Sequence, residues 1–364
     1  MEFEVSRVEF VKVLNLISNI VSDRQTIPIL SNVLLESVGK DKIHLNATDL
    51  KVSIQCNLNV NLIKSGSITI PAKRLLQIIK ELPDQPIHIS VNSKNQININ
   101  CGNSQFKITG LPKEEYPPIT FFKDTSFVLN QKEFKNMLKK VSIAVSTDTT
   151  RHILNGVYVK LHSEKLILVA TDGRRLAYVE KVGTYKIDGD KSFILPGKIV
   201  QELIKILKDE KDLTMILGDK EVVFEVENIR YMSQLIDGKY PNFEQVIPKK
   251  IKHEVVLSVS DFQGAVRRSS VLVDQKLNRI KFELKEGILE ISTKTPELGE
   301  SKEEMSVSYS GDSIAVGFSP NYILDVLKVI GEDNVTFGLT NEGKSGLIKA
   351  SPDFLYVIMP MRLV

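Results

Sequence analysis

The segment Ser6-x-x-Glu9-Phe10 returns as Asn130-x-x-Glu133-Phe134 and again as Ser258-x-x-Asp261-Phe262. The three phenylalanines are 124 and 128 residues apart, and apolar residues follow each of them at helical spacing. A short polar side chain followed three positions later by an acidic one is typical of a helix start, where both side chains bond unpaired backbone N–H groups. The recurrence predicts one amphipathic helix that is repeated three times.

A second signature lies about 60 residues after each first one. Pro71, Pro196 and Pro320 are 125 and 124 residues apart, and each is followed by an apolar pair. Proline suits the first helical turn, where its missing N–H is not needed. Runs rich in β-branched residues lie between the helices and predict short strands, among them 68–70, 97–99, 222–224 and 288–291.

These patterns predict an α+β fold of three repeated domains, each with two helices packed on antiparallel sheets. We place the domains at residues 1–125, 126–250 and 251–364, because the period is too long for a solenoid repeat.

Composition is that of an ordinary globular protein, with 42% hydrophobic and 26% charged residues. No run approaches the 18 or so apolar residues of a membrane helix, and the N-terminus lacks a basic region followed by an apolar stretch. We therefore expect a cytoplasmic protein without membrane contact. Cys56 and Cys101 have no CxxC spacing, so we expect buried thiols rather than a disulfide or a metal site.

Positive charge is concentrated in the predicted helices. The six helix windows hold 15 Lys or Arg against 6 Asp or Glu, whereas the rest of the chain holds 33 against 39. One charged helix face is ordinary solvation, but six equivalent helices with the same sign favour a surface for a polyanion.

No catalytic constellation emerges from the sequence. Residues 338–345 match the phosphate-loop pattern GxxxxGK[ST], yet a strand-like run follows where a phosphate loop needs a helix. We therefore expect a hairpin turn there. Asp172 stands in an Asp-Gly turn signal, and Asp49 occupies the equivalent place 123 residues earlier. The five histidines are dispersed, and we expect no cofactor and no metal.

The chain resembles a known family along its whole length: the beta sliding clamp, the beta subunit of bacterial DNA polymerase III. The resemblance rests on the order of several short motifs on the threefold repeat, namely 26–32, 70–73, 151–156, 170–177, 236–241, 322–327 and 357–363.

The resemblance implies three clamp domains per chain and a head-to-tail homodimer that closes a six-domain ring around duplex DNA. It implies a non-catalytic processivity factor that contacts double-stranded DNA without reading sequence. The implied partners are the DNA polymerase III alpha subunit, the clamp loader complex, and other polymerases and repair proteins that carry clamp-binding peptides.

Three sets of site residues follow from the resemblance and its matching motifs. The DNA-binding set is Lys12, Arg24, Lys73, Lys139 and Lys198. The partner-peptide pocket is Leu154, Thr171, Gly173, Arg174, Arg175, Leu176, Pro241, Gln245, Val246, Ser345, Val357, Ile358, Met359, Pro360, Met361 and Arg362, with Arg175 and Arg362 receiving polar or acidic groups of the peptide. The dimer interface is Lys73, Arg74, Ile78, Phe106, Lys107, Val271, Leu272, Glu297, Glu300, Glu303 and Glu304.

The sequence departs from the family pattern at four places. Arg174 stands where many members have histidine, Gln245 where a basic residue is common, and Val364 follows the usual Arg-Leu ending. Asp148 stands where a neutral DNA-contacting side chain is expected, which argues against DNA contact in that loop. Two alternatives stay open at this stage: an unrecognised nucleic-acid-binding enzyme, and a phosphate-loop nucleotidase.

Overall fold

The computed structural model describes residues 1–21, 27–185, 187, 189–208, 211–274, 278–296 and 298–363. The chain forms two compact units. The first comprises Met1–Gln131 and Leu207–Leu235, and the second comprises Lys132–Ile206 and Ile236–Val364.

Six α-helices lie in the described part of the chain, and all six occupy windows that the repeat predicts. They are α1 (Arg7–Ile20), α2 (Ala72–Glu81), α3 (Gln131–Ser142), α4 (Gly197–Ile206), α5 (Val259–Ser269) and α6 (Pro320–Val329). The signature phenylalanines Phe10, Phe134 and Phe262 are all buried, so the repeated apolar stripe does form the core.

The first unit holds two antiparallel sheets. One has the order β5 (Asn61–Lys64), β1 (Glu2–Val5), β7 (Ile87–Val91), β8 (Gln96–Cys101) and β9 (Ser104–Thr109). The other has the order β10 (Thr125–Asn130), β15 (Asp212–Leu217), β16 (Glu221–Val226), β17 (Ile229–Gln234), β4 (Val52–Asn59), β3 (Lys42–Thr48), β2 (Asn32–Val38) and β6 (Ser67–Pro71).

The second unit repeats this plan. Its eight-stranded sheet has the order β14 (Lys191–Pro196), β11 (Gly156–His162), β12 (Lys165–Thr171), β13 (Arg175–Val182), β25 (Phe354–Ile358), β24 (Gly346–Ser351), β23 (Asn334–Leu339) and β18 (His253–Ser258). Its four-stranded sheet has the order β21 (Gly299–Ser306), β20 (Ile288–Thr295), β19 (Ile280–Lys285) and β22 (Ile314–Phe318).

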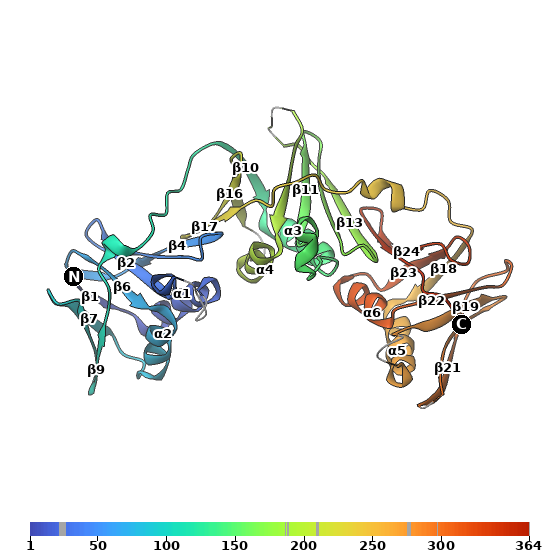
Figure 1. Cartoon of the computed structure of the whole chain (residues 1–364), viewed down its shortest axis with the longest axis horizontal. Helices are drawn as coiled ribbons and strands as arrows, with labels where there is room; N and C mark the ends of the chain where they lie inside the picture. Colours follow the sequence, from blue (N-terminus) through green and yellow to red (C-terminus); the bar gives the residue numbers. More distant parts are fainter. Residues whose placement is uncertain are drawn as a thin grey trace. The chain divides into compact units, whose positions relative to one another are not determined.

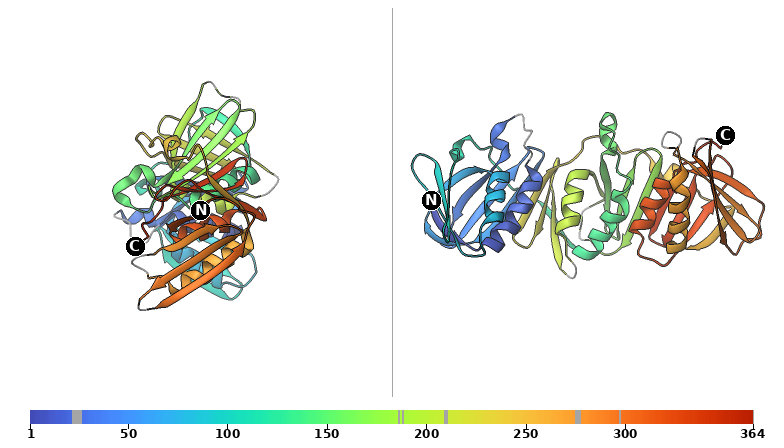
Figure 2. Two further views of the ribbon diagram at one scale, coloured as in Figure 1. Left: turned by 90° about the vertical axis from the view of Figure 1, so that its right-hand side faces the viewer. Right: turned by 90° about the horizontal axis from the view of Figure 1, so that it is seen from below.

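Within each unit the helices cover one side of the sheets. In the first unit α1 packs on β3 and β4, and α2 packs on β2 and β6 (Figure 1). In the second unit α4 packs on β11 and β14, and α5 packs on β18, β20 and β21. Helices α1 and α2 lie side by side, as do α5 and α6 (Figure 2). The strands therefore form the outer layer over the helices.

The local signals at the helix starts are only partly correct. Ser258 accepts a hydrogen bond from the Asp261 N–H at 3.4 Å, whereas Ser6 makes no side-chain cap, so the predicted capping box at Ser6 is wrong. Pro71 and Pro196 end strands β6 and β14 directly before their helices, and only Pro320 lies in a first helical turn. The start of a helix in this chain thus depends more on where the preceding strand ends than on a side-chain cap.

Both large sheets cross the boundaries predicted between domains. Strand β17 pairs with β4, and β25 pairs with β13, so each junction is a continuous backbone ladder. Strands from the predicted second domain therefore belong to the first compact unit. The three predicted domain ranges stay a prediction.

Cys56 and Cys101 are free, buried thiols, as expected. Burial raises the pKa of the Cys56 thiol to about 12, because the thiolate would lose its hydration. Among the described residues, no helix is both long enough and apolar enough to span a membrane.

Candidate protein-binding pocket

The turn between β12 and β13 is built by the side chains of Thr171 and Asp172. The Thr171 hydroxyl donates to the Arg175 carbonyl at 2.6 Å and accepts from the Gly173 N–H at 3.1 Å. Asp172 Oδ1 accepts from the N–H groups of Arg174 at 2.8 Å and Arg175 at 3.0 Å. These bonds confirm the interpretation of Asp172 as a turn residue.

Glycine is favoured at position 173, the tip of this turn, for two reasons. Its φ of +85° lies in the left-handed region, and an added Cβ would lie 2.7 Å from Arg151 Nη1. Arg151 is itself held by an ion pair of 3.0 Å with Asp148, whose carboxylate also accepts from the Thr150 N–H. The Asp148 carboxylate thus caps the short helix 149–154, which gives it a structural role.

Arg175 is fixed by contacts on three sides. Its guanidinium donates to Asp172 Oδ2 at 3.0 Å and to Asp325 Oδ2 at 2.8 Å, and it lies 4.4 Å from the centre of the Tyr322 ring. Only 11% of its side chain is exposed. Burial lowers the pKa of Arg175, but Tyr356 and Asp325 raise it on balance, so the side chain stays charged. Two carboxylates therefore already pair with this guanidinium, and a role for Arg175 in receiving an acidic group of a peptide stays a prediction.

The segment after β25 forms one wall beside this turn. The Met359 N–H donates to the Arg174 carbonyl at 2.8 Å, and the Ser345 hydroxyl donates to Met359 Sδ at 3.2 Å. Two residues on, the Met361 N–H donates to the Gly317 carbonyl at 2.8 Å, which ties the chain to the edge of β22. Met359 is therefore held from both sides while 44% of its surface stays exposed.

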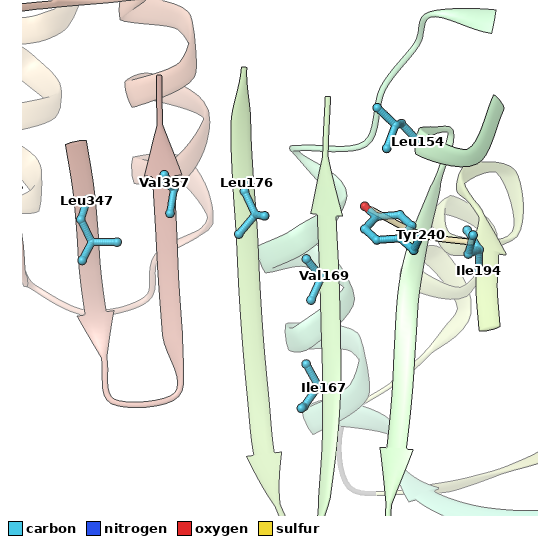
Figure 3. Close-up of a cluster of buried hydrophobic side chains, with 8 residues drawn as sticks. All are labelled: Leu154, Ile167, Val169, Leu176, Ile194, Tyr240, Leu347 and Val357. Carbon is cyan, nitrogen blue, oxygen red and sulfur yellow. The ribbon is translucent and has the colours of Figure 1, made fainter. Parts of the chain in front are cut away.

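An apolar pocket of about 160 Å³ opens between the turn, β25 and the segment 241–246. Three of its lining residues, Leu154, Leu176 and Val357, belong to a cluster of buried side chains. In this cluster Val357, Leu176 and Val169 stand on adjacent strands, and Tyr240 lies beside Ile194 (Figure 3). Tyr240 stacks on Tyr158 with 5.1 Å between ring centres. The buried apolar floor suits a small number of apolar anchor side chains from a partner.

Nine of the sixteen predicted pocket residues line this pocket: Leu154, Thr171, Gly173, Arg175, Leu176, Pro241, Val246, Val357 and Met359. Arg174 and Gln245 are exposed nearby, and Ile358 is fully buried. Pro360, Met361 and Arg362 line a neighbouring hollow over the four-stranded sheet, which shares Met359 with the pocket. Sequence reasoning missed Asn242 and Phe243, although an aromatic residue so close to the Tyr-Pro motif was a usable signal.

The phosphate-loop match is a hairpin, as predicted. Strands β23 and β24 pair antiparallel on either side of it, and no helix follows Ser345. Within the described ranges, no group of three or more side chains is arranged to hold a metal ion.

Three family models of the DNA polymerase III beta subunit match the chain in succession. The N-terminal domain matches residues 1–120, the central domain residues 128–242, and the C-terminal domain residues 244–362. The beta sliding clamp of Pseudomonas aeruginosa is 32% identical, with both chains covered in full. The chain belongs to the beta sliding clamp family.

Solved structures agree with this assignment. The Bacillus subtilis clamp is 28% identical with a TM-score of 0.95, and both chains are covered in full. A Pseudomonas aeruginosa clamp bound to griselimycin is 32% identical with a TM-score of 0.95, again over both whole chains. The three clamp domains of mixed helix and antiparallel sheet are thus those of the family.

The clamp's candidate DNA-binding residues lie on four different helices. Lys12 is on α1, where it pairs with Glu9 at 2.6 Å, and Lys73 is on α2. Lys139 and Lys198 are exposed on α3 and α4. Arg24 lies outside the described residues. Their contact with DNA stays a prediction.

The candidate interface residues lie on α2, on β9, and around α5 and β21. Phe106 is 39% exposed and Val271 76% exposed, whereas Ile78 already belongs to the buried face of α2. The acidic candidates have partners within the chain: Glu303 with Arg268, Glu304 with Lys302, and Glu300 with Lys294. Glu297 lies outside the described residues. The remaining candidates are Lys73, Arg74, Lys107 and Leu272.

Proposed function

We propose that two copies of this chain form a head-to-tail ring around duplex DNA and act as a non-catalytic processivity factor in the cytoplasm. Each copy contributes clamp domains at 1–125, 126–250 and 251–364. The apolar pocket tethers short peptides of the DNA polymerase III alpha subunit, the clamp loader complex, and other polymerases and repair proteins. Membership of the family and the free strand edges described next support this proposal.

The main support for the ring is a strand pairing that occurs twice within the chain and that could occur a third time between two copies. Strand β4 pairs with β17 at one junction, and its counterpart β13 pairs with β25 at the other. The third counterparts, β21 and β9, are the end strands of their sheets. A pairing of β21 in one copy with β9 in the other would continue the same ladder and close the ring.

Burial of one aromatic position supports this third junction. Tyr231 and Tyr356 hold the equivalent position on β17 and β25, and both are fully buried. Phe106 holds it on β9, opposite Ile99 in a hairpin of the same form, and is 39% exposed. We expect a partner copy to cover Phe106, with the Leu272 region adding apolar contact.

Sedimentation of charged variants tests the ring. Phe106→Glu and Leu272→Glu should sediment as monomers, because a buried charge without a partner opposes association. Val182→Glu is the matched control, since Val182 is also exposed on a strand but takes no part in the proposed junction. A wild-type chain that stays monomeric at micromolar concentration would contradict the ring itself, and a dimeric Phe106→Glu variant would contradict this junction.

Residence on circular DNA tests encirclement. The helix lysines supply attraction to phosphates without base contacts, so the ring can slide while its topology retains it. Combined replacement of Lys12, Lys73, Lys139 and Lys198 by Gln should weaken residence and flatten its salt dependence by about one unit of slope per lost phosphate contact. Equal residence of wild type and variant at all salt concentrations would contradict the DNA assignment.

Griselimycin is a practical probe of the pocket, because related clamps have been solved with it bound. We expect griselimycin to bind this chain and to compete with a polymerase-derived clamp-binding peptide. Val357→Glu should abolish both interactions while Val256→Glu, at an exposed position of β18, should leave them unchanged. Point variants serve better than deletion of the last residues, because Met361 also bonds the edge of β22.

A further inference from the structure

Three arginines border the pocket, and their guanidinium groups differ in what they already bind. Arg151 is paired with Asp148 and packs over Gly173. Arg175 is paired with both Asp172 and Asp325. Over the ranges that the structure describes, the Arg174 side chain has no ion pair or hydrogen bond, and it is exposed.

The backbone of Arg174 is nevertheless fixed at the pocket wall. Its N–H donates to Asp172 Oδ1 at 2.8 Å, and its carbonyl accepts from the Met359 N–H at 2.8 Å. Gly173, Arg175 and Met359 all line the pocket, so Arg174 stands among three lining residues. The backbone of an exposed arginine is thereby fixed directly beside the residues that line the pocket.

We propose that Arg174 selects partner peptides that carry an acidic residue next to the apolar anchor, and that Arg175 is a positioning residue. This inference rests on the proposed peptide-binding function. A guanidinium offers paired N–H donors to a carboxylate, which makes it a better match for Asp or Glu than for an amide. Arg175 already donates to Asp172 in the turn and to Asp325, whose bond holds β13 to α6.

A charge-swap experiment on the full-length protein tests the proposal. The probes are fluorescein-labelled peptides that share one Leu and one Phe anchor and carry Glu, Gln or Lys at each flanking position in turn. Wild type should bind the best Glu peptide about threefold to fivefold more tightly than its Gln form, as an exposed ion pair allows. Arg174→Gln should bind the two forms equally, and Arg174→Glu should prefer the Lys form.

Arg267→Gln is the matched control, because Arg267 is an exposed arginine on α5 that does not line the pocket. It should keep the wild-type preference, and 0.5 M salt should remove that preference from both proteins because salt screens exposed pairs. A wild type that binds Glu and Gln forms equally at every position would overturn the proposal, as would an Arg174→Glu variant that still prefers Glu. If neither the peptides nor griselimycin bind wild type, the proposed peptide-binding function fails instead.

Discussion

The turns at Thr48–Val52 and Thr171–Arg175 share one backbone design but differ in use. In the first, the Thr48 hydroxyl accepts from the Leu50 N–H at 2.9 Å, and Asp49 Oδ1 accepts from the N–H groups of Lys51 at 2.9 Å and Val52 at 2.7 Å. Thr171 and Asp172 make the same bonds 123 residues later. The neighbouring strand bonds both turns alike, through the Gln234 N–H and the Met359 N–H.

The differences lie in the side chains that the two scaffolds carry. Val52 is buried core, whereas its counterpart Arg175 reaches Asp325 on α6. The strand next to the first turn continues with polar Gln234, and the strand next to the second continues with Met359. An apolar pocket is found at the second turn, beside a methionine that suits contact with varied partners. The repeat gives both turns the same backbone, and a few different side chains at the second turn form the pocket.

Removal of the turn carboxylates should give the largest difference between the two turns. Asp172→Ala should lower the free energy of unfolding of its unit by about 3 kcal/mol, because Arg175 also loses one of its two carboxylates in a largely buried place. Asp49→Ala should cost about 1 to 2 kcal/mol, the value of its backbone bonds alone. Urea titration with hydrogen exchange over each turn measures both. Equal losses would show that the Asp172–Arg175 pair adds nothing to the turn.

Substitution of Met359 and Gln234, which bond the two turns from the neighbouring strands, tests whether the pocket depends on the methionine. Met359→Gln should weaken binding of a clamp-binding peptide about tenfold, because an amide replaces an apolar wall. Gln234→Met should leave that affinity within about twofold, since the first turn lies outside the pocket. Isothermal titration calorimetry with one peptide gives both values. An equal effect of the two substitutions would mean that Met359 acts only through general folding.

The smallest effects should come from the turn tips, and they should have opposite signs. Leu50 adopts a φ of +74°, so Leu50→Gly should stabilise its unit by about 0.5 to 1 kcal/mol. Gly173→Ala should destabilise by about 1 kcal/mol and displace Arg151. Thermal unfolding measures both changes, and peptide affinity reports the displacement of Arg151. Changes of the same sign would show that the two tips are not equivalent.

Much of this architecture follows from local patterns. The apolar stripe behind Phe10, Phe134 and Phe262 predicts the first helix of each repeat, because helical spacing depends only on neighbouring residues. The hairpin at 338–345 follows from a strand-like run on each side. The absence of a side-chain cap at Ser6 could not be predicted from local patterns, since a cap depends on a rotamer that packing can override.

The threefold repeat, the Asp-Gly turn and most of the pocket residues could be predicted from the sequence, because they follow from short-range spacing and recognisable motifs. Which arginine near the pocket lacks a carboxylate partner among the described residues could be seen only in the folded chain. Arg175 and Asp325 are 150 positions apart in the chain, and they meet because β25 pairs with β13 beside α6. Such pairing depends on long-range strand order and burial, and no local pattern encodes it.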